Sequence, residues 1–219
     1  MPPNPTRKAL TRTEIFGHAG RLFRLRGYAG TNIDDIMLAA GLTRGAFYAH
    51  FKSKDDLFAE VVRAGDGLLT RLRAPGSDVL KVLDIYLAKD NLAANALLCT
   101  LAALPGDVAR ASLPAQLAYA NGLYSLIAEL ARGRKRKLDA DATAAAILAI
   151  GAIGLARASG DRRLSDWLLR CARQAARALL RPSPLPRRAS PKQKRSRSRP
   201  KAAGARRPKR AARSRGGRA

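Results

Sequence analysis

A stretch of fourteen residues, GLTRGAFYAHFKSK at 41–54, sets the tightest limit on how this chain folds. Gly41 can adopt the left-handed conformation that ends a helix, and Thr43 offers a hydroxyl to cap the next helix. A short helix is predicted over 44–50. The rings of Phe47 in this helix and Phe51 directly after it would lie one turn apart on a single face. Because that aromatic face packs inward, the sequence predicts a short helix that presents a polar face at the surface.

A second short helix is predicted directly before this stretch, over residues 33–40. Thr31 and Asp34 have the spacing of a capping box, in which each side chain accepts a backbone N–H at the helix start. Helix, glycine turn and helix at this spacing form the helix-turn-helix of DNA-binding proteins. A purely structural corner of two helices gives the same pattern, so the pattern alone leaves both interpretations open.

The polar face of the predicted 44–50 helix carries side chains suited to DNA. Arg44 can offer two N–H donors to O6 and N7 of guanine in the major groove. Small residues at Gly45 and Ala46 would let the backbone approach the base edges. Contacts to phosphate, which position a helix without reading sequence, are predicted for the remaining polar residues. These are Thr31, Thr43, Tyr48, His50 and Lys54.

The same residues resemble the DNA-binding domain of TetR/AcrR-type bacterial transcriptional regulators. The resemblance covers roughly residues 12–62 and is most specific in Gly45-Ala46-Phe47-Tyr48-x-His50-Phe51-x-Ser53-Lys54. It implies a three-helix DNA-binding domain and a helical domain that binds a small-molecule effector and forms a homodimer. It also implies that the polar positions named above are the usual DNA contacts. Binding of a small apolar effector among the middle helices would change the spacing of the two recognition helices, one 44–50 helix per subunit, and release a palindromic operator.

Composition predicts an all-α protein. Hydrophobic residues make up 47% of the chain and aromatic residues only 5%, and alanine and leucine dominate. Four segments are expected in turn: a disordered basic arm (1–9), a helix-turn-helix domain (10–54), an effector-binding and dimerisation domain (55–181) and a disordered tail (182–219). Further helices are predicted over 10–26, which Gly27 ends, and over 54–72, which Ser53 caps. The remaining helices are predicted over 79–90, 95–104, 113–132, 139–158 and 165–180.

The net charge of +26 indicates a polyanionic partner, for which double-stranded DNA is the natural candidate. Sixteen of the 42 basic residues lie from Arg181 onward without an acidic residue, which leaves +10 for residues 1–180. That tail lacks the apolar pattern needed for a packed core. It is either a second, sequence-independent DNA contact or a compositional extension typical of a high-GC genome, and a linker-histone-like architectural role stays open.

The last two predicted helices, over 139–158 and 165–180, are expected to form the dimer interface. The first is rich in alanine and glycine and too apolar to face water, and small residues let another helix approach closely. The second alternates apolar residues with arginines that can lie at the rim. The predicted interface residues are Ile147, Gly151, Leu155, Trp167 and Leu168.

No catalytic constellation, metal site or cofactor motif stands out, so an enzyme is not expected. Cys99 and Cys171 are predicted to be reduced core thiols of a cytoplasmic protein. Cys99 is also a weak candidate for an electrophile-sensitive effector site, although a buried small hydrophobe is the simpler interpretation. The longest uncharged apolar stretch, 142–156, is too short to cross a membrane.

These observations predict a bacterial, nucleoid-associated transcriptional regulator without cofactors that represses as a homodimer. Two alternatives belong to other classes. One is an architectural DNA-binding protein dominated by its basic tail, and the other is a ligand-binding module that has lost DNA recognition. The second alternative is disfavoured because the polar face of the 44–50 helix is intact.

Overall fold

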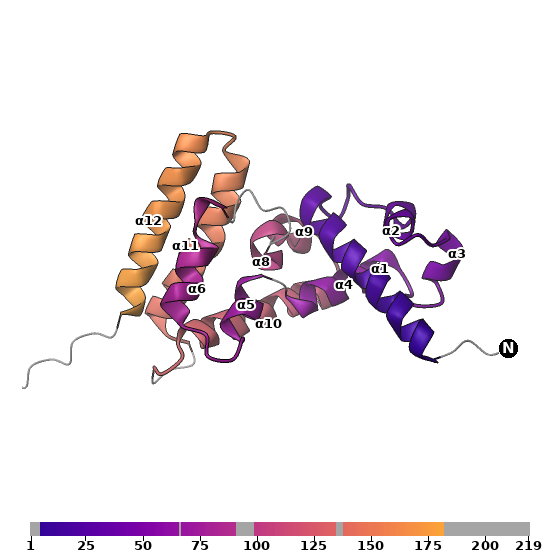
Figure 1. Cartoon of the computed structure of the whole chain (residues 1–219), viewed down its shortest axis with the longest axis horizontal. Helices are drawn as coiled ribbons and strands as arrows, with labels where there is room; N and C mark the ends of the chain where they lie inside the picture. Colours follow the sequence, from indigo (N-terminus) through magenta and orange to yellow (C-terminus); the bar gives the residue numbers. More distant parts are fainter. Residues whose placement is uncertain (1–4, 66, 91–98, 135–137, 182–219) are drawn as a thin grey trace, which may run out of the picture. The chain divides into compact units, whose positions relative to one another are not determined.

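The computed structural model describes residues 5–65, 67–90, 99–134 and 138–181. The described part is all-helical and contains no β-strand, which confirms the predicted fold class (Figure 1). The predicted tail at 182–219 and residues 95–98 of the predicted 95–104 helix lie outside the described residues, and α8 falls within the rest of that predicted helix. The helices are α1 Pro5–Arg26, α2 Ile33–Ala39, α3 Arg44–Phe47, α4 Lys54–Ala64, α5 Leu68–Leu72, α6 Val79–Tyr86, α8 Thr100–Ala103, α9 Pro105–Ala109, α10 Leu113–Leu130, α11 Ala140–Ala158 and α12 Arg162–Leu180.

The first helix begins earlier than the sequence suggested. Residues 5–9 belong to α1, so the expectation of a disordered arm over 1–9 is wrong for these five residues. The helix ends where expected, because Gly27 takes a φ of 75° and its N–H donates to the carbonyl of Phe23 at 2.8 Å. Because α1 ends at a defined residue, the position of the following helix-turn-helix relative to α1 is fixed.

The start of α2 differs from the expected one by one residue. Asn32, not Thr31, is the N-cap, and its side-chain oxygen accepts the N–H of Asp35 at 2.7 Å. The Asp35 carboxylate in turn accepts the N–H of Asn32, which completes a capping box. Thr31 is buried and its hydroxyl donates to the carbonyl of Gly27 at 2.9 Å. Thr31 thus stabilises the connection between α1 and α2, residues 27–32, which we call the α1–α2 corner.

The helix predicted over 54–72 is two helices. Ser53 caps α4 as expected, and its hydroxyl accepts the N–H of Asp56 at 3.1 Å. Gly65 then ends α4 in the left-handed conformation with a φ of 63°, and Gly67 follows with a φ of 105°. A Cβ at Gly67 would lie 2.7 Å from the backbone of Cys99. The break therefore lets the chain pass close to the start of α8.

The buried side chains form two clusters, and α4 belongs to the first. That cluster joins α1–α4 with residues of α8–α10, including Leu104, Val108 and Ala115. The second cluster joins α5, α6, α8 and the C-terminal part of α10 to α11 and α12. Residues of α4 such as Leu57 and Val62, which the sequence placed in the effector-binding domain, therefore pack in the same core as the helix-turn-helix.

Helices α11 and α12 lie side by side and antiparallel (Figure 1). Asp139 and Asp161 cap them, so α12 starts at Arg162, three residues before the predicted start. Six alanines of α11 are buried, which permits close helix packing. Among the described helices α11 alone is long and apolar enough to suit a membrane span, a test that buried core helices also pass.

Candidate nucleic-acid interface

Helices α2 and α3 are joined by the turn that the sequence predicted. Gly41 takes a φ of 67°, and the N–H of Leu42 donates to the carbonyl of Met37 at 2.8 Å. Phe47 and Phe51 are both buried, with ring centroids 5.7 Å apart. The aromatic side of α3 is therefore fixed in the first core, and the opposite side faces outward.

The recognition helix is shorter than predicted. Its α-helical part is Arg44–Phe47, and residues 48–50 form a turn that returns the chain to Phe51. The N–H of Phe51 still donates to the carbonyl of Phe47 at 3.0 Å. Thr43 has the extended backbone of an N-cap, but its hydroxyl makes no capping hydrogen bond.

Five of the predicted DNA contacts lie next to one another at α3: Arg44, Gly45 and Ala46, predicted to face the bases, and Thr43 and Tyr48, predicted to contact phosphate. Thr43, Arg44, Gly45 and Tyr48 are exposed, and Ala46 is half-buried. A Cβ at Gly45 would meet no atom within 4 Å, so the space in front of this backbone is open. We call these five residues the α3 surface. It combines an arginine, a hydroxyl and an uncrowded backbone, which suits contact with the edges of bases in a groove.

Lys54 occupies a different place from the one predicted. Its ammonium donates to the carbonyls of Tyr28 at 3.1 Å and Thr31 at 2.9 Å, and it lies 4.0 Å from the centre of the Tyr28 ring. These contacts tie the start of α4 to the α1–α2 corner. Lys54 and Thr31 are therefore structural residues here, and neither lies on the α3 surface.

Tyr28 connects this corner to two further elements. Its hydroxyl donates to the Asp55 carboxylate on α4, and its backbone N–H donates to the Asp107 carboxylate on α9 at 3.0 Å. Burial raises the pKa of Tyr28 to about 12, and the Asp55 contact adds to that rise. The phenol therefore remains a hydrogen-bond donor at neutral pH. Sequence reasoning missed Asp107, which is 79 residues from its partner.

His50 is half-buried, and its Nδ1 atom has no hydrogen-bond partner among the described residues. Burial lowers the His50 pKa, and the positive charges of Lys8 and Arg12 lower it further. A neutral imidazole carries no charge to attract phosphate. Lys8, whose charge acts on His50, and the exposed Lys52, four residues after Tyr48, are additional candidates for phosphate contacts.

Cys99 is buried at the start of α8, as the simpler interpretation predicted. Two phenols border it. Burial raises the pKa of Tyr119 to about 12 and also raises the pKa of Tyr86, and the thiol adds to both shifts. The Tyr119 hydroxyl donates to the carbonyl of Leu101 at 2.6 Å. Cys171 is exposed on α12, so its prediction as a core thiol is wrong.

The predicted dimer residues of α11 and α12 are exposed or half-buried. Ile147, Leu155 and Trp167 are 67%, 60% and 59% exposed, and Gly151 and Leu168 are half-buried. A Cβ at Gly151 would meet nothing within 4 Å. We call these five residues the α11–α12 face. It is apolar, and none of the described elements covers it.

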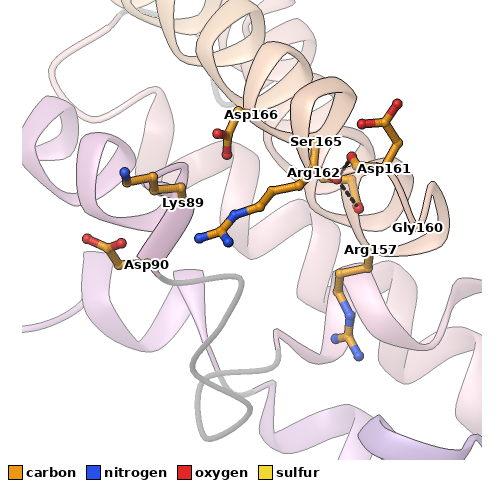
Figure 2. Close-up of a pocket in the computed structure, with 9 residues that line it drawn as sticks. Lys89, Asp90, Arg157, Gly160, Asp161, Arg162, Ser165 and Asp166 are labelled. Carbon is orange, nitrogen blue, oxygen red and sulfur yellow. Dashed lines mark hydrogen bonds between the residues drawn. The ribbon is translucent and has the colours of Figure 1, made fainter.

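A cleft of about 580 Å³ lies between the end of α6 and the α11–α12 turn (Figure 2). Its lining is charged and includes Lys89, Asp90, Arg157, Arg162 and Asp166. This lining does not match the apolar effector site expected among the middle helices. Within the described residues, no group of three His, Cys, Asp or Glu side chains could hold a metal ion.

A short helix fixed by buried aromatic residues behind a glycine turn defines a helix-turn-helix DNA-binding domain. The family model for bacterial regulatory proteins of the tetR family matches residues 15–61. The transcriptional regulator AcrR of Shigella flexneri is 51% identical over 51 residues, which are 23% of this chain and 24% of that protein. The transcriptional repressor KstR2 of Mycolicibacterium smegmatis is 39% identical over 62 residues, which are 28% of this chain and 30% of that protein.

The likeness in fold extends over most of the described chain. A TetR-family transcriptional regulator from Cytophaga hutchinsonii superposes with a TM-score of 0.61 at 21% identity, covering 80% of this chain and 98% of that one. The helix-turn-helix domain of this chain therefore matches the TetR/AcrR family. The chain's sequence match to AcrR and KstR2 spans only a quarter to a third of their length.

Proposed function

We propose that this protein is a sequence-specific transcriptional repressor that binds a palindromic operator as a homodimer and releases it when a small molecule binds. The observation that carries the proposal is the α3 surface. Its exposed Arg44 and open Gly45 backbone lie on a helix that two buried phenylalanines hold in place. The α3 surface also lies within residues 15–61, which match the family model of bacterial regulatory proteins of the tetR family.

The homodimer follows from the α11–α12 face. Three large apolar side chains more than half exposed on a helix pair are unfavourable for a monomer in water. The open space at Gly151 would admit a partner helix at close range. Two-fold pairing there would present two copies of the α3 surface to successive turns of DNA, which requires an operator with inverted half-sites.

Effector binding would be coupled to operator release through the α1–α2 corner. Tyr28 is bound from one side by Lys54 of the DNA-binding domain and from the other by Asp107 of α9. A ligand that shifts α8 and α9 would therefore move the end of α1 and the entry to α2. The buried surroundings of Cys99 are the place where such a ligand would be bound, since α5, α6, α8 and α10 meet there.

The proposed function is binding without catalysis, in the bacterial cytoplasm and in association with the nucleoid. Its partners are double-stranded DNA, a second copy of the chain and a small apolar effector, and it needs no cofactor. Selection of bound duplexes from a random pool by the full-length protein at about 0.2 M salt tests this function. We expect an inverted repeat with one half-site for each α3 surface. Recovery of unrelated sequences would favour the architectural alternative instead.

A further inference from the structure

One charged contact joins the two helices of the helix-turn-helix. Arg44 is the first residue of α3, and its Nη1 donates to Oδ2 of Asp34 on α2 at 2.6 Å. The two side chains are 59% and 57% exposed, so the pair lies on the surface that the proposed function assigns to DNA. The contact therefore involves the one residue expected to read a base.

Local structure does not require the carboxylate of Asp34. The capping box at the start of α2 is formed by Asn32 and Asp35, and Asp35 also lies 3.9 Å from Arg26. An ion pair between two exposed side chains contributes little to stability. A negative charge on a DNA-facing surface, moreover, repels phosphate. Asp34 thus stands where it weakens general DNA binding without holding the fold together.

We propose that Asp34 is a positioning residue for base recognition and acts by orienting Arg44. A guanidinium has five N–H donors in a planar fork, and Asp34 engages one end of that fork. The other edge is left to donate to O6 and N7 of guanine, a pairing that needs two donors in one plane. Fixing the side chain in advance also reduces the rotamer entropy that binding removes.

The contact between Asp34 and Arg44 favours discrimination between DNA sequences over affinity for DNA in general. An arginine without this carboxylate could turn toward any nearby phosphate, and such contacts carry no sequence information. With Asp34 present, the guanidinium is kept from the phosphates and its partner on DNA must be a base with two acceptors. The inference rests on the proposed function, because it concerns how the α3 surface selects its operator.

The test uses the full-length protein, its selected operator, and the same duplex with the guanine read by Arg44 replaced in both half-sites. We expect Asp34→Ala to reduce the preference between these duplexes about threefold, while binding to unrelated DNA becomes tighter. Asp35→Ala removes the same charge one residue away and should leave the preference unchanged. In an Arg44→Ala background, Asp34→Ala should change binding to both duplexes by the same factor.

Two results would overturn the inference, and circular dichroism would first establish that each variant is folded. A wild-type preference retained by Asp34→Ala would show that the contact is only a surface ion pair. An equal loss of preference in Asp35→Ala would show that Asp34 acts through charge alone and not through Arg44. A wild-type protein without any sequence preference would instead refute the proposed function, which separates the two failures.

Discussion

Methionine substitutions at Lys52 and Lys54 separate a DNA contact from a structural contact only two residues apart. Lys54 donates to two backbone carbonyls and lies over the Tyr28 ring, whereas the Lys52 side chain is exposed. Methionine keeps most of the aliphatic stem and removes the charge in both cases. We therefore expect Lys54→Met to lower stability and Lys52→Met to lower DNA affinity.

The expected decrease in stability is set by the interactions of the Lys54 ammonium. A hydrogen bond to a charged group contributes about 1.5–3 kcal/mol, and a cation over an aromatic ring about 0.5–2 kcal/mol. Because Lys54 is only half-buried, water can replace part of these interactions when the ammonium is removed. We expect about 2–3 kcal/mol less stability in urea unfolding for Lys54→Met, and a change within about 0.5 kcal/mol for Lys52→Met.

The salt dependence of DNA binding should be affected in the opposite way: Lys52→Met should change it and Lys54→Met should not. Removing one phosphate-binding lysine per subunit should reduce the slope of log affinity against log salt by about one per subunit, so Lys52→Met should show a shallower slope. Lys54→Met, measured where it is fully folded, should keep the wild-type slope. A Lys54→Met variant with wild-type stability and a shallower slope would refute the structural role and restore Lys54 as a phosphate-binding residue.

Three further substitutions, the first with Gly41→Ala as its control, test other parts of the structure. Gly67→Ala should lower the free energy of chemical unfolding by about 3 kcal/mol or more, because the added Cβ would lie 2.7 Å from backbone. Gly41→Ala, whose Cβ would lie in open space, should lower it by only about 1 kcal/mol because of the positive φ. Equal losses of stability in the two variants would contradict this. Asp107→Ala leaves the N–H of Tyr28 without its acceptor and should cost about 1–2 kcal/mol, with faster hydrogen exchange at that amide; unchanged exchange would remove the proposed link. Gly151→Glu places a carboxylate on the α11–α12 face and should give a monomer or an aggregate that no longer binds operator; a variant that sediments as a dimer and binds operator would refute this interface.

The helix-turn-helix could be predicted because its determinants are local. The glycine at 41, the spacing of Phe47 and Phe51 and the outward Arg44 all lie within one short stretch. The capping error has an equally local cause. Thr31 and Asn32 are both good capping residues, and only the observed corner shows that the threonine hydroxyl is used by the carbonyl of Gly27.

The contacts that sequence reasoning missed join residues far apart in the chain. Lys54 reaches carbonyls 23 and 26 residues away, and Asp107 reaches an amide 79 residues away. Backbone carbonyls and amides leave no signature in a sequence, so a lysine in a DNA-binding motif is naturally assigned to phosphate. The division of the 54–72 helix at Gly65 depends likewise on the close approach at Gly67, which only the fold reveals.

The central claim is that the α3 surface reads DNA sequence, and Arg44 offers its most direct test. The measurement is the affinity of the wild-type protein and of Arg44→Ala for the selected operator and for each of its symmetric base-pair changes. We predict that one G·C pair per half-site, worth about 1–3 kcal/mol to the wild type, loses its effect in Arg44→Ala while the other positions keep theirs. If every base-pair change costs both proteins the same, Arg44 does not read a base and the claim is wrong.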